Sequence, residues 1–273
     1  MSLQNKTAFI TGASRGIGRA IALKLAQAGA NVIIAAKSTT EDPRLGGTIF
    51  SVAEEINNAG GKALPVQLDI RFEDQIQSAI SQAVSAFGGI DILVNNASAI
   101  QLTNTEQTET NRFDLIHNIN VRGTFLVTKA SIPHLKKSSN AHILNISPPL
   151  NIKPKWFKPY VAYAISKYNM SMLIMGWAEE LKQYNIAANA LWPKTTIATA
   201  AVKNLLGGDA LIKKSRTPAI IADAAHYILS QPVANCSGNF FIDEEVLKGQ
   251  GVNDFSIYAV DATQKLQQDL FLD

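Results

Sequence analysis

Seven short runs of apolar and β-branched residues recur along this chain, and longer helical stretches lie between them. Several runs, such as VIIAA and IDILV, are apolar at successive positions, as is typical of strands covered on both faces of a parallel sheet. Strands that alternate with helices form right-handed βαβ units, so the pattern predicts a doubly wound sheet. The predicted strands are Thr7–Thr11, Val32–Ala36, Ala63–Asp69, Ile90–Asn95, His142–Ser147, Ala187–Trp192 and Asn239–Ile242.

The stretches between the strands predict helices on both faces of this parallel seven-stranded sheet. Gly29 and Gly88 each follow a last helical turn, which is a usual helix stop. Thr217-Pro218 has the character of an N-cap and a first turn. The predicted helices run from Gly16 to Gly29, from Phe72 to Phe87, from Arg112 to Leu135, from Tyr160 to Tyr184, and onward from Pro218.

The length of the chain favours one α/β domain. Its 273 residues, 47% of them hydrophobic, suffice for a sizeable core, and no linker interrupts them. We expect residues 1–245 to form the domain and residues 246–273 to form a C-terminal extension of it. The extension and the segment STTEDPRLGG, which follows the second strand, are candidates for lids or subunit contacts.

A glycine-rich turn joins the first predicted strand to the first predicted helix, in the segment FITGASRGIGRAIA. Gly12 suits a tight turn, Gly16 lets the backbone approach a phosphate, and Gly18 allows close packing of helix on strand. The helix N-terminus adds free N–H groups and the positive end of its dipole. Within a βαβ unit this arrangement predicts a Rossmann-type dinucleotide site, whereas a glycine-rich turn alone also occurs without a ligand.

Two cations near the expected adenosine ribose favour NADP over NAD. An NAD site usually offers a carboxylate to the ribose 2′-OH about 20 residues after the turn, where Lys37 stands instead. Lys37 and Arg15 would suit the 2′-phosphate of NADP; the alternative is that both are solvated surface charges. Asp69 is either an acceptor for the adenine amino group or a helix cap. The expected cofactor contacts here are Gly12, Ala13, Ser14, Arg15, Gly16, Ile17, Gly18, Lys37, Asp69 and Ile70.

Tyr163 and Lys167 lie four residues apart on a predicted helix and therefore share one face. A free tyrosine has a pKa near ~10, and a lysine cation one turn away is expected to lower that pKa by favouring the phenolate. Beside a nicotinamide, such a pair can move a proton while the cofactor moves a hydride. On its own, YAISK is also an ordinary helix start, so its interpretation depends on the motifs around it.

The motifs TGASRGIG, NNAS, INVRG and YAISK, in this order, resemble those of the short-chain dehydrogenase/reductase family. The resemblance covers about residues 5–243, nearly the whole chain. Three finer features, NASAIQLTNT, ISPPLNIKPKWF and ALWPKT, resemble one branch of that family. Members of the branch often carry a C-terminal sterol-carrier domain, and we expect this chain to end before such a domain begins.

The resemblance implies a role for each matching residue. Tyr163 would be the general acid/base, and Lys167 would bind the nicotinamide ribose and tune Tyr163. Asn120 would hold a water in a proton relay, or else be a polar helix position satisfied by the backbone. Asn95 and Ala97 would lie beneath the cofactor, although Asn95 also suits a role in the sheet. Pro193 would lie near the nicotinamide carboxamide.

The chain departs from the family pattern at three places. The usual catalytic serine falls on Pro148, which has no hydroxyl, and Ser147 stands one residue early on the strand. Neighbouring strand residues point to opposite faces, so Ser147 is a doubtful substitute. Lys194 stands where glycine is common and is a candidate contact for an acidic substrate group or a phosphate. Glu244-Glu245 also replaces glycines and would alter a subunit contact.

These features support two interpretations of function. The first is an NADP-dependent oxidoreductase that interconverts a carbonyl and a hydroxyl group on an apolar, lipid- or sterol-like substrate. Trp156, Phe157 and Trp192 near the expected site agree with such a substrate but suit an ordinary core equally well. The second is an NADP-binding regulatory or sensing protein with little catalysis, which Pro148 in the serine position would explain.

Composition and charge weigh against several other classes of protein. The net charge of +3 is small and scattered, which argues against a nucleic-acid partner. A lone cysteine, Cys236, excludes a disulfide framework, and the four histidines lack the spacing of metal ligands. No run approaches the ~18 to 20 apolar residues of a membrane span. We expect a cytoplasmic protein, with an organelle not excluded, that forms a homodimer or homotetramer by family resemblance.

Overall fold

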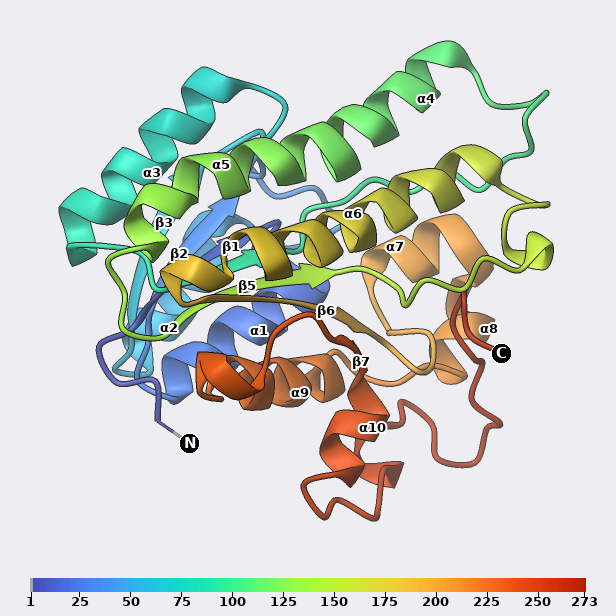
Figure 1. Cartoon of the computed structure of the whole chain (residues 1–273). Coiled ribbons are helices and arrows are strands. Elements are labelled where there is room, and N and C mark those ends of the chain that lie inside the picture. Colours follow the sequence, from blue (N-terminus) through green and yellow to red (C-terminus); the bar gives the residue numbers. More distant parts are fainter. Residues whose placement is uncertain (1) are drawn as a thin grey trace.

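The computed structural model describes residues 2–273 and contains one sheet of seven parallel strands in the order β3-β2-β1-β4-β5-β6-β7. The predicted doubly wound parallel sheet is therefore confirmed (Figure 1). The strand order reverses beside β1, and in such sheets ligands bind beyond the carboxyl ends of the strands at this point. The strands are β1 (Thr7–Thr11), β2 (Asn31–Ala36), β3 (Lys62–Gln67), β4 (Ile92–Asn95), β5 (Ala141–Ile146), β6 (Ile186–Trp192) and β7 (Phe240–Ile242).

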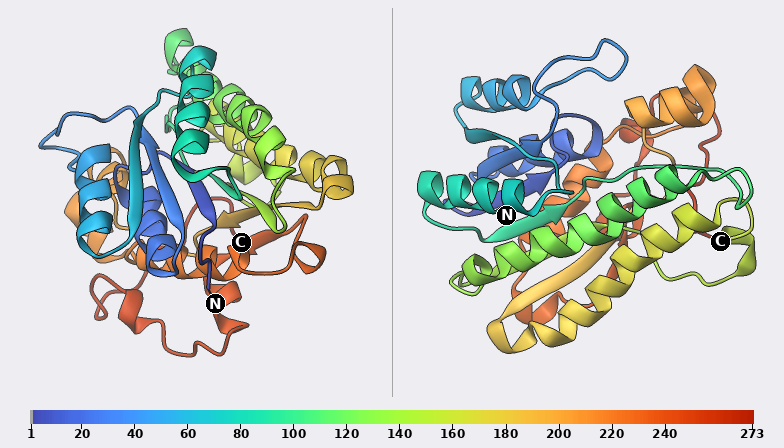
Figure 2. Two further views of the ribbon diagram at one scale, coloured as in Figure 1. Left: turned by 90° about the vertical axis from the view of Figure 1, so that its left-hand side faces the viewer. Right: turned by 90° about the horizontal axis from the view of Figure 1, so that it is seen from above.

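Helices cover both faces of the sheet, as the apolar strands predicted (Figure 2). Alternate side chains of β1 enter separate cores: Ala8 and Ile10 pack on one side, and Phe9 packs on the other. The first face carries α1 (Gly16–Gln27), α2 (Ile49–Asn58), α9 (Ala219–Leu229) and α10 (Asp243–Lys248). The second face carries α3 (Glu73–Phe87), α5 (Thr124–Leu135) and α6 (Val161–Glu180).

The helix predicted over Arg112–Leu135 is continuous but irregular. It consists of α4 (Thr110–His117), a π-helical turn (Asn118–Gly123) and α5. Such turns are rare and often mark functional sites, because they redirect side chains out of the regular helical array. Here the turn carries Asn120, whose side chain is fully buried.

Several short helices were not predicted. A capping box at Thr48 and Ser51 begins α2, directly after the STTEDPRLGG loop. Three short turns lie between β6 and α9, namely α7 (Ala200–Val202), a π-helical turn (Lys203–Gly207) and α8 (Gly208–Lys213). Four 3₁₀ turns complete the chain: Pro154–Trp156, Lys182–Tyr184, Val233–Asn235 and Ser256–Tyr258.

Residues 249–273 have little regular structure beyond one 3₁₀ turn, yet they return to the body of the protein. The Tyr258 hydroxyl donates to Asp223 of α9 at 2.7 Å, and the Thr196 N–H donates to the Gln267 carbonyl at 2.9 Å. The chain then ends beside the loop that follows β5 (Figure 1). Within residues 2–273, no helix is both long enough and apolar enough to cross a bilayer.

Candidate active site

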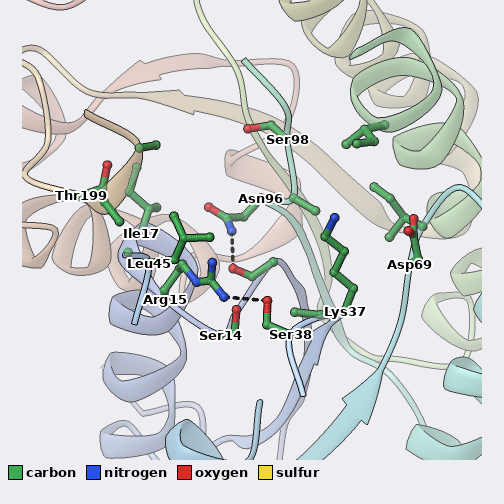
Figure 3. Close-up of a pocket in the computed structure, with 18 of the residues that line it drawn as sticks. Ser14, Arg15, Ile17, Lys37, Ser38, Leu45, Asp69, Asn96, Ser98 and Thr199 are labelled. Carbon is green, nitrogen blue, oxygen red and sulfur yellow. Dashed lines mark hydrogen bonds between the residues drawn. The ribbon is translucent and has the colours of Figure 1, made fainter. Parts of the chain in front are cut away.

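A cavity of about 400 Å³ lies at the carboxyl ends of β1 to β4, where the strand order reverses (Figure 3). It brings together most residues expected to bind a cofactor: Gly12, Ser14, Arg15, Gly16, Ile17, Lys37, Asp69, Ile70 and Ala97. Ala13, Gly18, Asn95, Tyr163, Lys167 and Pro193 were also expected but do not line it. Sequence reasoning missed Ser38, Leu45, Asn96, Ser98, Ile119, Thr199, Asn204 and Leu205. Several of these residues directly follow the ends of strands. Because parallel strands end at one shared edge of the sheet, the predicted strand ends could have identified them.

The glycine turn, here called the glycine cradle, packs closely against the segment after β4 and leaves no room for side chains at Gly12 or Gly18. Gly12 has φ +66°, and a Cβ on it would lie 2.9 Å from the Cα of Ala97. A Cβ on Gly18 would lie 2.5 Å from the Gly12 carbonyl oxygen, which agrees with its predicted packing role. The first turn of α1 contains no acidic residue, so an anion would meet free N–H groups there. The cradle and the exposed helix N-terminus therefore fit the phosphates of a dinucleotide.

Two cations line the cavity on the side of β2. The Arg15 guanidinium donates to the Ser38 hydroxyl at 2.6 Å, and Lys37 extends between Asn96 and Asp69 (Figure 3). The Arg15 Nε is buried, and no group within residues 2–273 accepts from it. Burial lowers the pKa of Arg15, and the charge of Asp42 partly offsets this. The Arg15 Nε and the Lys37 ammonium fit a phosphate on the β2 side of the cavity.

The Asp69 carboxylate accepts three side-chain bonds from Arg71, two from the guanidinium Nε at 3.0 and 3.1 Å and one from a terminal nitrogen at 2.6 Å. Its carboxylate also accepts from the Arg71 N–H at 3.1 Å, so it closes a turn before α3. Burial alone would raise the pKa of Asp69, but the Arg71 bonds outweigh it and the net shift is downward. An ionised carboxylate thus stands on the β3 side of the cavity.

Tyr163 and Lys167 lie on one face of α6, both buried. The Lys167 ammonium donates to the Ile146 carbonyl at 2.7 Å and to the Met170 sulfur at 3.3 Å. Burial lowers the pKa of Lys167 to about 7, and the charge of Asp269 opposes that shift. Lys167 was expected to lower the pKa of Tyr163, but burial raises it instead, as do Asp269 and Tyr160. The Tyr163 hydroxyl is therefore protonated at neutral pH.

Asn120 connects α6 to the segment after β4. Its side-chain oxygen accepts from the Ala99 N–H at 2.8 Å, and its amide donates to the Ala99 carbonyl and the Ser166 hydroxyl, each at 3.0 Å. Ser166 in turn donates to the Tyr163 carbonyl at 2.8 Å. The Asn120 amide is thus occupied by protein groups, in line with the structural alternative to a water relay.

The ends of β4 and β5 are joined by buried amides. The Asn95 amide donates to Thr128 at 3.0 Å and to Asn145 at 2.9 Å, which places it inside the sheet rather than in the cavity. Asn96, the next residue, faces the cavity and donates to the Gly12 carbonyl at 3.1 Å. The cavity is thus lined by Asn96 rather than by Asn95, and a coenzyme contact of Asn95 stays a prediction.

Ser147 is buried just beyond the end of β5, and no group within residues 2–273 bonds its hydroxyl. The next carbonyl, that of Pro148, accepts from the Ser171 hydroxyl at 2.6 Å, which fixes the strand end to α6. A role for Ser147 beside Tyr163 stays a prediction.

Two departures from the family pattern lie in contact. The carboxylate of Asp243 accepts from the N–H groups of Lys194 and Glu244, at 2.8 and 2.6 Å. Burial raises the pKa of Asp243 to about 6, against the effect of these bonds. The Lys194 ammonium pairs with Glu245 at 3.7 Å, so it faces a carboxylate of its own chain, and Pro193 is buried beside it.

The C-terminal extension supplies site residues that sequence reasoning did not single out. Phe271 is fully buried with its ring centroid 6.3 Å from that of Tyr163. Asp269 lies close enough for its charge to affect both Tyr163 and Lys167. Burial raises the pKa of Asp269 to about 7, with Asp243 adding to the shift and the Leu270 N–H and Lys167 opposing it.

The geometry agrees with comparisons to known proteins. Residues 6–208 match the sequence profile of the family described as short chain dehydrogenase. The chain is 58% identical to human hydroxysteroid dehydrogenase-like protein 2 over 267 residues, which confirms the branch indicated by the finer motifs. That alignment covers 98% of this chain but 63% of the human protein, so the chain spans less than two thirds of this curated relative.

Two solved structures share the fold. A putative dehydrogenase from Xanthomonas campestris is 49% identical, superposes with a TM-score of 0.96, and matches over 100% of both chains. A metagenomic short-chain oxidoreductase in complex with NADP is 27% identical, with a TM-score of 0.72 over 89% of this chain and 98% of its own. Both therefore share the fold of this chain, and the second of them binds NADP.

Proposed function

Because the chain belongs to the short-chain dehydrogenase family, we propose that it interconverts a carbonyl and a hydroxyl group on an apolar substrate with NADP(H). The observation that carries this proposal is the placement of Tyr163 and Lys167 on one buried face of α6, in the same fold as a cavity with a glycine cradle and two cations. Family membership supports the oxidoreductase class, and the substrate and the coenzyme preference are our inference.

Tyr163 is the proposed general acid/base. When bound, the nicotinamide supplies or accepts the hydride at the carbonyl carbon. In the direction of reduction, the Tyr163 hydroxyl gives its proton to the carbonyl oxygen as negative charge develops there. The phenol is protonated at neutral pH, but the burial that raises the pKa of Tyr163 also makes it a weaker proton donor. A protonated Lys167 would stabilise the phenolate through its charge, and because burial lowers the pKa of Lys167 to about 7, this effect should weaken above neutral pH. Ser147 is a candidate second donor.

The coenzyme would be held by the glycine turn and by the cavity on the β2 side. Gly12, Ser14 and Gly16 would receive the pyrophosphate, while Lys37 and Arg15 would meet a 2′-phosphate. Asp69, ionised at neutral pH, would accept from the adenine amino group. The NADP complex of the metagenomic relative supports this assignment for the fold.

The preference for NADP is testable at Lys37. Lys37→Ala is expected to weaken NADPH binding about 10- to 100-fold, because a charge-assisted bond to phosphate contributes about 1.5 to 3 kcal/mol. NADH lacks that phosphate, so its dissociation constant should barely change. Coenzyme fluorescence titrations measure both constants. Lys62→Ala serves as the matched control, because Lys62 begins β3 and so lies at the other edge of the sheet from the cavity. Equal losses for NADPH and NADH would remove the assignment of Lys37 to the 2′-phosphate.

A homo-oligomer through α4, α5 and α6 is part of the proposal. The continuous helix formed by α4 and α5 runs alongside α6 on one face (Figures 1 and 2), and the three expose large apolar side chains at Phe113, Phe125, Met172 and Met175. Several such side chains on neighbouring helices form the kind of apolar surface that often marks an interaction site. Phe125→Glu is expected to shift sedimentation toward monomer, while Phe50→Glu on α2 should not. A wild-type monomer at micromolar concentration would refute this interface.

A second candidate function is coenzyme binding with little catalysis. It is favoured by Pro148, which offers no hydroxyl to a carbonyl oxygen, and by the enclosure of Tyr163, which is 6% exposed. Such a protein would bind NADPH tightly and consume none of it with any carbonyl compound. Tyr163→Phe would then change neither the binding constant nor any rate, which separates this candidate from the first.

A further inference from the structure

Phe271 is enclosed by aromatic rings that come from three segments of the chain. Its side chain is 0% exposed, and it belongs to a cluster separate from the two cores on the faces of the sheet. We call the five surrounding rings the aromatic cage. Their centroids lie at 5.1 Å (Tyr168), 5.9 Å (Trp192), 6.1 Å (Trp156), 6.2 Å (Tyr160) and 6.3 Å (Tyr163) from that of Phe271.

The backbone of Phe271 does not favour this arrangement by itself. Its φ of +70° lies in the left-handed region, where a bulky residue is disfavoured. The contacts of the ring must therefore outweigh a local conformational cost. Two bonds assist: the Trp192 indole N–H donates to the Leu270 carbonyl at 2.9 Å, and the Asn151 amide donates to the Phe271 carbonyl at 3.3 Å.

Within the segment 268–273, Asp273 forms its contacts at the surface of the protein. Asp273 pairs with Lys153 at 2.6 Å and with Lys155 at 2.7 Å, and all three side chains are exposed. Exposed ion pairs contribute little and weaken with salt. No helix or strand includes residues 268–273, and one β-bridge joins Gln268 to Thr195. Release of this segment would break the contacts of Phe271, the packing of Leu270 and Leu272 on the same cluster, and the bond from the Asp269 N–H to the Lys194 carbonyl at 3.1 Å.

The Phe271 ring lies beside the proposed general acid. Tyr163 is also one wall of the aromatic cage, and its ring centroid is 6.3 Å from that of Phe271. A molecule that approaches Tyr163 through the cage would therefore meet the Phe271 ring. The volume next to the reacting group is thus shaped for a flat apolar ring, since its present occupant is one.

We propose that the aromatic cage is the binding subsite for a planar apolar group beside the substrate carbonyl, and that Phe271 is a built-in occupant that the substrate displaces. The substrate class is then a carbonyl compound with a ring next to its reacting carbon. This inference rests on the proposed function for the identity of the reacting group. The aromatic cage, the Phe271 ring inside it and the surface ion pairs of Asp273 are present whether or not the protein catalyses a reaction.

The test uses acetophenone, a ketone with a phenyl ring on its carbonyl, and acetone, which lacks the ring. Both are titrated without coenzyme, so that no reaction occurs. Hydrogen exchange of the peptide 266–273 follows release of the segment, and fluorescence of Trp156 and Trp192 follows binding. Acetophenone is expected to bind and to raise exchange in this peptide several-fold, while acetone should do neither at the same concentration.

Removal of the built-in occupant is expected to strengthen binding. Phe271→Ala should bind acetophenone about 10-fold more tightly, because a site that is mostly self-occupied has a reduced apparent affinity. The double variant Lys153→Gln, Lys155→Gln should show faster exchange of residues 266–273 and an intermediate affinity, and it provides the test if Phe271→Ala does not fold. Phe50→Ala, an exposed phenylalanine on α2, should behave as wild type.

Two outcomes would overturn the proposal. Acetophenone that binds while exchange of residues 266–273 stays constant or falls would make the segment a permanent wall. A Phe271→Ala or double-lysine variant with wild-type affinity would show that no occupant competes. Because coenzyme is absent, displacement without later NADPH oxidation would count against the proposed function alone. Ketone reduction with unchanged exchange would count against the subsite alone.

Discussion

Replacing Tyr163 with phenylalanine is expected to lower kcat for carbonyl reduction by about 10²- to 10⁴-fold, the usual contribution of a positioned acid. No hydrogen bond joins the Tyr163 hydroxyl to another of residues 2–273, so its removal breaks none within this part of the chain. The ring contacts with Tyr160 and Phe271 are kept by phenylalanine. The free energy of unfolding and the dissociation constant of NADPH should therefore stay close to wild type.

Tyr258→Phe is the matched control, since it makes the same chemical change away from the cavity. The Tyr258 hydroxyl donates to Asp223 at 2.7 Å, so this variant should lose about 1 kcal/mol of stability and retain its kcat. Steady-state kinetics, urea unfolding and coenzyme titration on both variants separate the two effects. A Tyr163→Phe variant with undiminished kcat would show that another group supplies the proton.

Asn120→Leu is expected to lower the free energy of unfolding by about 3 to 5 kcal/mol. The Asn120 side chain makes three bonds, two to the backbone of Ala99 and one to Ser166, and it is fully buried. Leucine would leave the Ala99 N–H and carbonyl without these partners. Because the π-helical turn positions this amide, its loss should also loosen the contact between α6 and the segment after β4. Urea unfolding measures the change.

Ser166→Ala provides the comparison for Asn120. It removes one of the three bonds and leaves both bonds to Ala99, so it should cost about 1 kcal/mol. If Asn120→Leu cost no more than Ser166→Ala but abolished turnover, the amide would act in a proton relay rather than as a structural link.

The sheet was predictable because its signals are local. Buried parallel strands are apolar at successive positions, and each predicted strand overlaps an observed one, β1 with the same bounds. The glycine turn could also be recognised from the sequence. Gly12 and Gly16 both have positive φ, a backbone conformation that few other residue types adopt. Tyr163 and Lys167 followed from helical spacing alone.

The C-terminal part of the site was not predictable in the same way. Residues 249–273 show neither helical nor strand periodicity, and their place is set by contacts with segments about 80 to 120 residues away, such as those with Trp192 and Asn151. The pKa of Tyr163 was mispredicted for the same reason. Its burial depends in part on Phe271, which no spacing within α6 reveals.

The one-residue shift between Asn95 and Asn96 shows a second limit. A motif identifies the pair, but which amide faces the cavity depends on where the strand ends. The structure ends β4 at Asn95, whose amide turns into the sheet. Pro148 raises a similar question at the end of β5, where the family serine would stand.

The most direct test of the proposed function is a single-turnover measurement of NADPH consumption. Enzyme in excess over NADPH is mixed with aryl and alkyl ketones and aldehydes, and loss of the reduced coenzyme is followed optically in wild type and in Tyr163→Phe. We predict complete loss with at least one ring-bearing carbonyl compound in wild type, and a rate about 10²- to 10⁴-fold lower in the variant. Tight NADPH binding with no loss across the whole panel would contradict the account and favour the sensing protein.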